Sequence, residues 1–491
     1  MEFSFQIIDF LVATPMIALF VASILPLFFK VLKGNKELNP VFVLGCAFIG
    51  IISSGGLTIT LNASTTYAFS KALVFDGISI WTNITILFVT GFSLLYSREN
   101  VSISKNLFSE YVFLVLNSAI GMMIIASAND LIVTFIGIEL MSLCLYVIIA
   151  LGANEKHAKQ SAFKYFVLGS FASAILLYGI ALIFGSVGST YLDEVGSIAA
   201  GLISTNRLFL IGFAMVIIGY GFKVGAAPFH AWVPDVYEGA PTPVTTFMAT
   251  GVKIVTFTAF IRLAATQALS GERALEFVNV LEWVAVLTML IGNIGALRQE
   301  SFKRMLAYSS VAHAGYAFVG VIASGVGGNV ILGASGVIYY IFGYAIMTLG
   351  TFGVVTLFEK DENTTLTMDG LKGLASRNPW AAFCITVLLL SLAGIPPTVG
   401  FFGKFFIFSA AIKQGFFWVS VWGVLNSVIS VYYYLKPVVR MYMNDEEGAP
   451  LVGNRQLSQL SVTVMTILVI VVGLASDPFY QYVKTSVSKL F

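Results

Sequence analysis

The sequence is poor in cysteine and in charged residues, and it lacks the common cofactor motifs. Its three cysteines, Cys46, Cys144 and Cys384, lie far apart, so an iron–sulfur cluster, a zinc site or a disulfide framework is not expected. There is no GxGxxG fingerprint and no Walker loop, because "GFFGKFF" lacks the upstream glycine spacing and the following Ser or Thr. The net charge of +2 gives no reason to expect a nucleic-acid partner.

Apolar residues dominate the chain. It is 58% hydrophobic and 11% charged, whereas a soluble domain carries about 25% charged residues. Since a membrane span needs about 20 apolar residues, the apolar runs predict an all-α polytopic protein with fourteen transmembrane helices. We place them near 9–30, 41–61, 75–96, 108–127, 129–151, 162–185, 208–228, 241–265, 279–297, 304–323, 331–358, 378–412, 416–442 and 458–476.

No soluble domain is expected between these helices. The longest connections, 185–207, 359–377 and 443–457, are short and polar, and we expect them to be loops. No basic segment precedes the first apolar run, so we interpret that run as a retained helix and not as a cleaved signal peptide.

Basic residues gather on one side of the predicted membrane. If the N-terminus lies outside, 17 of the 27 lysines and arginines fall on inside loops and 7 on outside loops. This distribution follows the positive-inside rule and places both termini outside. The count leaves three lysines that fit no loop, and we expect them in the membrane: Lys223, Lys253 and Lys404.

Two consecutive blocks of five predicted helices form an internal repeat. Each block holds a helix interrupted by proline, at Pro228 in the first and at Pro396 and Pro397 in the second. Because five is odd, the blocks must enter the membrane from opposite sides, which makes the repeat inverted. Interrupted helices at matching positions of two halves mark the ion or substrate site of a transporter. The expected parts are a three-helix segment, two five-helix repeats and a C-terminal helix: 1–107, 108–265, 279–442 and 443–491.

The buried charges are the strongest candidates for function. A charge at the bilayer centre costs about 2.5–3.5 kcal/mol on the insertion scale, and Glu139 joins the three lysines in mid-span. Burial lowers the pKa of a lysine and a nearby carboxylate raises it, so a Glu–Lys pair can take up and release a proton. Pro228 would open the helix so that water reaches Lys223. The alternative is that these charges only hold helices together.

Other polar residues allow more than one interpretation. His230 and His313 suit a proton relay, since the histidine pKa lies near 6.5, but each is equally a structural hydrogen-bonding group. Lys164 is either a loop anchor or a relay member. Asp235 and Glu238, in the turn "DVYEGAPTPV", can meet a partner or form a proton entrance. Water-binding and interhelical roles are both open for four further residues, Tyr308, Ser309, Ser310 and Tyr316.

Three motifs make the sequence familiar. "KVGAAPFHAWVPDVYEGAPTPVTTFMATGVK", "RQESFKRMLAYSSVAHAGY" and "LAGIPPTVGFFGKFFIF" resemble the antiporter-like subunits of respiratory complex I, over residues 100 to 440. The resemblance implies one proton channel built from two inverted five-helix units. Within it, Glu139 matches the helix-five glutamate and Lys223 its helix-seven lysine partner. Lys253 matches the helix-eight connecting lysine, and Lys404 the helix-twelve lysine that leads to the exit.

The resemblance also implies a location and partners. The chain would lie in the bacterial inner membrane, in contact with lipid and with other membrane-arm subunits of complex I. It would carry no cofactor, while NAD, flavin, iron–sulfur clusters and quinone would be bound by partner subunits. Two alternatives remain open: a subunit of a multisubunit sodium/proton antiporter, and a structural membrane scaffold.

Overall fold

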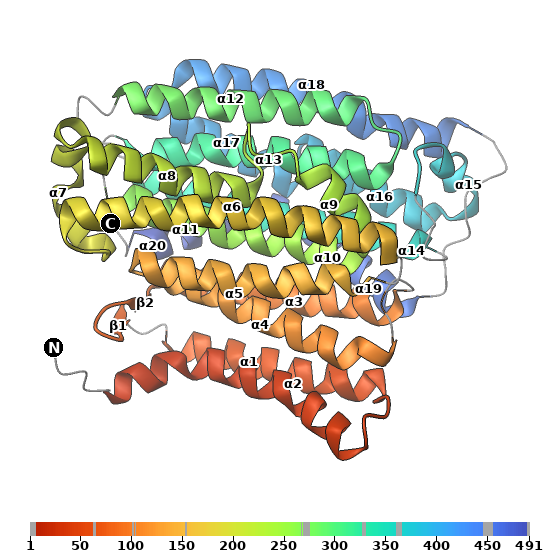
Figure 1. Cartoon of the computed structure of the whole chain (residues 1–491). Helices are drawn as coiled ribbons and strands as arrows, with labels where there is room; N and C mark the ends of the chain where they lie inside the picture. Colours follow the sequence, from red (N-terminus) through yellow and green to blue (C-terminus); the bar gives the residue numbers. More distant parts are fainter. Residues whose placement is uncertain are drawn as a thin grey trace.

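The computed structural model describes residues 6–61, 65–100, 103, 105–152, 155–266, 268, 275–326, 330–359, 366–444 and 455–488. Long helices run side by side through the whole molecule, and both termini lie at one end of the bundle (Figure 1). The only sheet found in the described residues is a short hairpin of β1 (Thr66–Ala68) and β2 (Leu73–Phe75), at the same end. The predicted all-α architecture is confirmed.

The first part of the described chain runs to residue 265. Its elements are α1 (Ile7–Leu32), α2 (Pro40–Thr60), α3 (Gly77–Glu99), η2 (Lys105–Leu107), α4 (Phe108–Ser127), α5 (Leu131–Ala150), α6 (Glu155–Val187), α7 (Leu192–Thr205), α8 (Arg207–Val224), α9 (Val233–Gly239), α10 (Thr242–Phe247), η3 (Met248–Val252) and α11 (Lys253–Ala265). The segments α10, η3 and α11 are continuous and make one long helix, since η3 is a π-helical turn inside it.

The second part begins at residue 275. Its elements are α12 (Leu275–Leu297), α13 (Phe302–Gly325), α14 (Val330–Phe358), η5 (Asp369–Leu371), α15 (Leu374–Arg377), α16 (Pro379–Ala393), α17 (Val399–Lys413), α18 (Phe417–Met443), α19 (Gln456–Leu474) and α20 (Ser476–Val487). Helices α12 and α18 pack together along the edge of the bundle opposite α1 and α2 (Figure 1).

The number of spans agrees with the prediction once the interrupted helix is considered. Within the described residues, twelve helices are long and apolar enough to cross a membrane. The predicted span 378–412 is divided into α16 and α17, of 15 residues each, which are too short to qualify alone. The remaining span is α18, whose 27 residues are long enough but include several tyrosines, Lys436 and Arg440.

Connection 185–207 differs from the prediction. We expected a polar loop, but it contains the 14-residue helix α7. Its buried residues, Leu192, Val195, Ala199 and Ile203, recur at helical spacing and form one apolar face. The helix therefore lies across the end of α8, at the end of the bundle that holds the termini (Figure 1). Parts of the other two expected loops, 360–365 and 445–454, lie outside the described residues.

Helix starts follow local capping signals. Asp76 and Asp130 cap α3 and α5 by accepting hydrogen bonds from backbone amides of the first turn. Asp76 has a second role, because both its carboxylate oxygens accept from Arg262 at 3.0 Å. Arg262 was one of the seven lysines and arginines that we assigned to outside loops from the sequence, but its side chain is 3% exposed. The reason is that Asp76 and two bonds to the Ala126 carbonyl satisfy the guanidinium inside the bundle.

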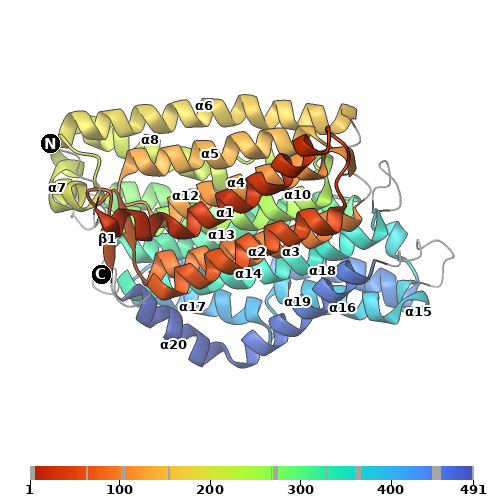
Figure 2. The same cartoon turned by 90° about the horizontal axis from the view of Figure 1, so that it is seen from below.

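The central helices are enclosed by the others. In an 18-residue apolar window of Thr242–Ala265, 100% of the residues are buried, and in that of Phe302–Gly325, 94% are buried. The corresponding share is 39% for both Ile7–Leu32 and Lys156–Val187. Seen from below, α6 lies along one edge of the molecule and α20 along the opposite edge (Figure 2). The outer helices therefore present apolar side chains outward, and polar groups on the central helices are shielded from lipid.

Candidate functional site

The first intramembrane lysine lies where α8 ends. Lys223 is 2% exposed, and its Nζ donates to Ser142 Oγ on α5 at 2.8 Å. Glu139 lies one turn earlier on α5, close enough for electrostatic attraction to Lys223, and it accepts a hydrogen bond from Ser173 of α6. The two charged groups do not form a direct ion pair. In this state the ammonium group is bound by Ser142 and not by the carboxylate.

The break after Lys223 is built by glycine and fixed by side chains. Gly225 caps α8 with φ +73°, a conformation that glycine adopts without strain. The turn that follows is held because the Ala227 amide donates to Thr288 Oγ1 at 2.9 Å and the Trp232 indole donates to the Phe222 carbonyl at 3.1 Å. The chain thus leaves the helix axis and re-enters a helix only at α9.

His230 lies in this turn and is half-buried. Among the described residues, its Nδ1 has no hydrogen-bond partner. The structure thus gives His230 no direct contact with Lys223, and its place in a relay stays a prediction. Lys164 is also separate: it pairs with Asp235 of α9, and both side chains are about two-fifths exposed, at 38% and 40%.

The second lysine lies at a distortion of its helix. Lys253 directly follows the π-helical turn Met248–Val252, a feature often found at functional sites. Its Nζ donates to the Ser310 carbonyl and to Ser310 Oγ at 2.5 Å, and it lies 4.9 Å from the centre of the Tyr344 ring. The side chain is 3% exposed, and these contacts connect α11 to α13 and α14.

A buried histidine and two tyrosines continue from there. His313 of α13 is 2% exposed. Its Nδ1 lies 2.6 Å from the Tyr340 hydroxyl, and its Nε2 lies 3.0 Å from the Tyr434 hydroxyl. Tyr434 also hydrogen-bonds to Ser309, the neighbour of the serine that holds Lys253. Every one of these groups can both donate and accept, which a chain of proton transfers requires.

The third lysine lies at the second break. Helix α16 ends with Gly394 at φ +88°, and Lys404 of α17 reaches back to that end. Its Nζ donates to the Leu392 and Ala393 carbonyls at 3.2 and 2.9 Å and to Ser427 Oγ at 2.8 Å. The ammonium group also lies 4.8 Å from the centre of the Tyr316 ring.

The two breaks share an electrostatic design. Lys223 is in the last turn of α8, and the Lys404 ammonium group binds the last carbonyls of α16. Both cations therefore lie at the negative end of a half-helix, where free carbonyls favour positive charge. Among the described residues, neither lysine is bound directly by a carboxylate.

Several residues of this site were not singled out from the sequence. They are the side chains that bind the charged groups: Ser142, Ser173, Tyr340, Tyr344, Ser427 and Tyr434. Tyr340 and Tyr344 have the i, i+4 spacing that places two residues on one helix face. That spacing is their only sequence signal, because buried tyrosines in apolar helices resemble ordinary core residues.

Gly394→Ala tests whether the second break positions Lys404. The alanine would cost about 1–2 kcal/mol for its left-handed backbone, and its Cβ would lie 3.1 Å from Lys404 Cδ and 3.2 Å from Nζ. We expect lower stability in thermal unfolding and reduced proton transport. Gly415→Ala is the control, because Gly415 has φ +89° but nothing within 4 Å of an added Cβ. Equal transport in the two variants would contradict a positioning role for Gly394.

The chain is similar to a known family of membrane proteins. The family described as "NADH:quinone oxidoreductase/Mrp antiporter, TM" matches residues 128–430. The NADH-quinone oxidoreductase subunit N of Bdellovibrio bacteriovorus is 49% identical over 488 residues, which cover 99% of this chain and 100% of that protein.

Solved structures agree with the sequence match. A chain of respiratory complex I from Thermus thermophilus with bound Aureothin has 29% identity and a TM-score of 0.81, covering 95% of this chain and 98% of that one. A chain of the Mrp complex from Dietzia sp. DQ12-45-1b, 20% identical, shares the fold with a TM-score of 0.79 and covers 98% of this chain and 97% of that one. The chain therefore belongs to the NADH:quinone oxidoreductase/Mrp antiporter family of membrane subunits.

Proposed function

We propose that this chain is subunit N of a bacterial proton-translocating NADH:quinone oxidoreductase and that it carries protons across the membrane. Its own contribution would be transport, coupled to quinone reduction by partner subunits of the membrane arm and of the redox arm. The single observation that carries the proposal is the set of three buried lysines at two helix breaks and one π turn. These are Lys223, Lys253 and Lys404.

The contacts of the lysines support proton transfer. A lysine held by a carboxylate is kept charged, whereas a lysine bound by neutral hydroxyls and carbonyls can lose its proton when its surroundings change. Among the described residues, Lys253 and Lys404 donate only to such neutral acceptors. Lys223 adds a regulated case, because Glu139 is close enough for electrostatic attraction while Ser142 accepts the hydrogen bond. Moving Glu139 toward or away from Lys223 would hold or release the proton there.

A path between the lysines can be traced. From Lys253 the chain of contacts leads to Ser310, then by the adjacent Ser309 to Tyr434 and His313. In this path His313 takes a proton at one ring nitrogen and gives one from the other, and water bridges the remaining gaps. Lys404 would then pass the proton toward the aqueous phase on the far side.

Orientation and cofactors follow from the same proposal. The end of the bundle that holds both termini would face the periplasm, since 17 lysines and arginines were assigned to the opposite side. NAD, flavin, iron–sulfur clusters and quinone would be bound by partner subunits. The described residues contain no group of three or more His, Cys, Asp or Glu side chains that could hold a metal.

The second candidate is a subunit of a multisubunit sodium/proton antiporter, which the shared fold of the Mrp chain supports. An affinity tag on this chain separates the two. Purification from native membranes in mild detergent should recover iron–sulfur proteins and NADH:quinone reductase activity together with the tagged chain. Recovery of an assembly without redox activity, which exchanges sodium for protons in vesicles, would favour the antiporter.

A further inference from the structure

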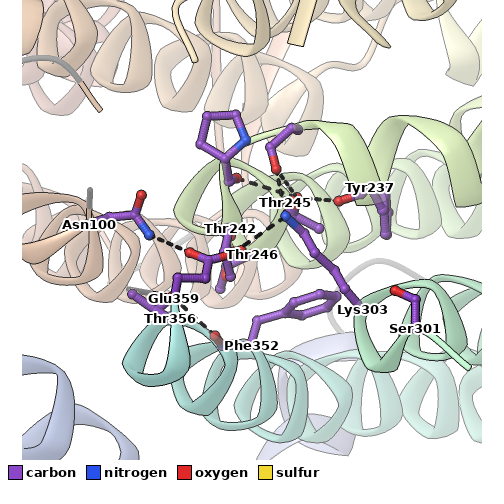
Figure 3. A network of polar contacts seen from close by, with 12 residues as sticks. Asn100, Tyr237, Thr242, Thr245, Thr246, Ser301, Lys303, Phe352, Thr356 and Glu359 are labelled. Atoms are coloured by element: carbon purple, nitrogen blue, oxygen red, sulfur yellow. Dashed lines mark hydrogen bonds and ion pairs between the residues drawn. The ribbon is translucent and has the colours of Figure 1, made fainter. Parts of the chain in front are cut away.

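A second buried ion pair lies at the end of the bundle opposite the termini. Lys303 begins α13 and Glu359 follows α14, and their side chains are only 12% and 10% exposed. Figure 3 shows the two side chains beside Asn100, which follows α3, and residues of α9, α10, α13 and α14. Lys303 was one of the 17 lysines and arginines that we assigned to inside loops from the sequence, and the sequence analysis did not single out Glu359. Neither residue takes part in the path described above.

The Glu359 carboxylate is held mainly by neutral donors. One oxygen accepts from the Thr242 hydroxyl, and the other accepts from Asn100 Nδ2 at 2.7 Å. The Lys303 Nζ is 4.0 Å from the carboxylate, and its closer contact is the Ala240 carbonyl at 2.6 Å (Figure 3). The ion pair is therefore long. If it is weakened, Glu359 keeps its bonds to Thr242 and Asn100, and Lys303 keeps its bond to the Ala240 carbonyl.

Thr242 starts a line of hydroxyls that ends at Lys253. Thr242, Thr246 and Thr250 are each 0% exposed, and steps of four, four and three residues lead from Thr242 to Lys253. In an α-helix such steps keep side chains on one face, and here the last step passes through the π turn Met248–Val252. At a rise of about 1.5 Å per residue, the line is about 16 Å long. At one end of the line Thr242 contacts Glu359, which follows α14, and at the other end Lys253 contacts the Tyr344 ring of α14.

The hydroxyls of Thr246 and Thr250 each donate their hydrogen to a backbone carbonyl one turn back, so each oxygen can still accept a hydrogen bond. Thr246 Oγ1 donates to the Thr242 carbonyl at 2.8 Å, and Thr250 Oγ1 donates to the Thr246 carbonyl at 2.7 Å. Each oxygen keeps lone pairs for a further hydrogen bond from water or a neighbour. Because the whole span is enclosed by protein, the line does not face lipid.

We infer that Glu359 is the group that collects protons at this end of the bundle and supplies them to Lys253 along the threonine line. The inference rests on the proposed function. The Glu359 carboxylate takes a proton from water, which weakens its attraction to Lys303. The proton then passes through hydroxyls and water to the free lone pair of a neutral Lys253, which becomes an ammonium group. Glu359 returns to its charged form and binds Lys303 again.

The other acidic cluster at this end is less suited to the task. Asp235, in α9 outside the candidate spans, bonds to Lys164 and to Arg304 at 2.9 Å. Partial burial raises the pKa of Asp235. The Lys164 hydrogen bond and the charges of Lys164 and Arg304 outweigh this effect and bring the pKa below its usual value. Asp235 therefore stays ionised at neutral pH and does not hold a proton.

Glu359→Gln tests the inference in the intact complex. Glutamine keeps the size and an acceptor oxygen but cannot bind or release the proton. We expect assembly to survive and proton pumping with quinone reduction, per assembled complex, to fall at least about tenfold. Glu300→Gln is the matched control, since it makes the same change at the same end of the bundle in a side chain that is 64% exposed. It should leave both activities unchanged.

A pair of threonine variants tests the line itself. Thr246→Val and Thr256→Val each remove a buried hydroxyl that donates to the carbonyl four residues earlier, at 2.8 and 2.7 Å. Thr246 lies between Glu359 and Lys253, whereas Thr256 lies beyond Lys253. We expect lower pumping only in Thr246→Val. This pair also decides the matter if Glu359→Gln fails to assemble.

Lys253→Ala separates the inference from the proposed function. If Lys253→Ala stops pumping while Glu359→Gln and Thr246→Val pump normally, protons reach Lys253 by another path and the inference is wrong. If all three pump normally, the proposed function fails as well. If Thr246→Val and Thr256→Val lose proton pumping to the same extent, the Lys303–Glu359 pair and the threonines only stabilise the packing of helices. That result would overturn the inference.

Discussion

Lys223→Ala is expected to stop both proton pumping and donor-driven quinone reduction in complexes that still assemble. A positioned acid or base contributes about 10²–10⁴-fold to a proton-transfer step, and Lys223 is the only lysine of the three that has a carboxylate nearby. Without it, Glu139 loses the charge it attracts, and Ser142 loses the ammonium group that donates to it. Because pumping and reduction are coupled, we expect the two activities to fall together, each by at least about tenfold.

The comparison variant for this prediction is Lys413→Ala. Lys413 ends α17, and its side chain lies at the end of the helix, away from the path. Both variants remove one lysine from an interrupted helix region, so a general effect of lost charge would appear in both. Activities should be measured in native membranes after the amount of assembled complex is determined. Normal activity in Lys223→Ala would mean that the lysine is a structural charge.

Arg262→Ala is expected to have the largest effect on stability. The guanidinium makes two bonds of 3.0 Å to Asp76 and bonds of 3.1 and 2.9 Å to the Ala126 carbonyl. Removing one partner leaves a buried, uncompensated carboxylate, which costs about 3–5 kcal/mol. We therefore expect less assembled complex and a lower midpoint of thermal unfolding in detergent.

The activity of the remaining complexes distinguishes this structural pair from the proton path. Arg262 connects α11 to α3 and α4 near the end that holds the termini, and its hydrogen bonds go to Asp76 and Ala126 and not to the three lysines. Pumping per assembled complex should therefore be close to normal. Replacing Asp76 with Asn in the same chain should recover part of the lost stability, because the unpaired charge is removed. A normal unfolding midpoint in Arg262→Ala would contradict the account.

The membrane architecture could be predicted from the sequence because its signals are local. Apolar runs of sufficient length indicated the spans, and prolines beside Lys223 and Lys404 indicated the two interrupted helices. Amphipathic α7 was missed, since a short helix with one apolar face is easily read as a polar connection. The π turn at Met248–Val252 has no clear local signal. It forms in a fully buried span, where an added Cβ on Gly251 would lie 2.7 Å from Met122.

The candidate site was predictable in its charges but not in its partners. Intramembrane lysines are conspicuous because a buried charge is costly, so Lys253 could be found without a structure. Its partners could not, since Ser310 is 57 residues away in the chain. Tyr434 is 121 residues from His313. Arg262 was misassigned for the same reason: its partner Asp76 is 186 residues away, and position near a span end suggested a loop.

The central claim is that Lys223 binds and releases a proton, and Lys223→Arg tests it most directly. Arginine keeps the positive charge near Glu139, but it does not lose its proton in proteins. The measurement is proton pumping together with donor-driven quinone reduction in native membranes, per assembled complex. Our account predicts that Lys223→Arg loses both activities as Lys223→Ala does. Pumping and reduction close to normal in Lys223→Arg, with loss in Lys223→Ala, would show that only a fixed positive charge is needed and would contradict it.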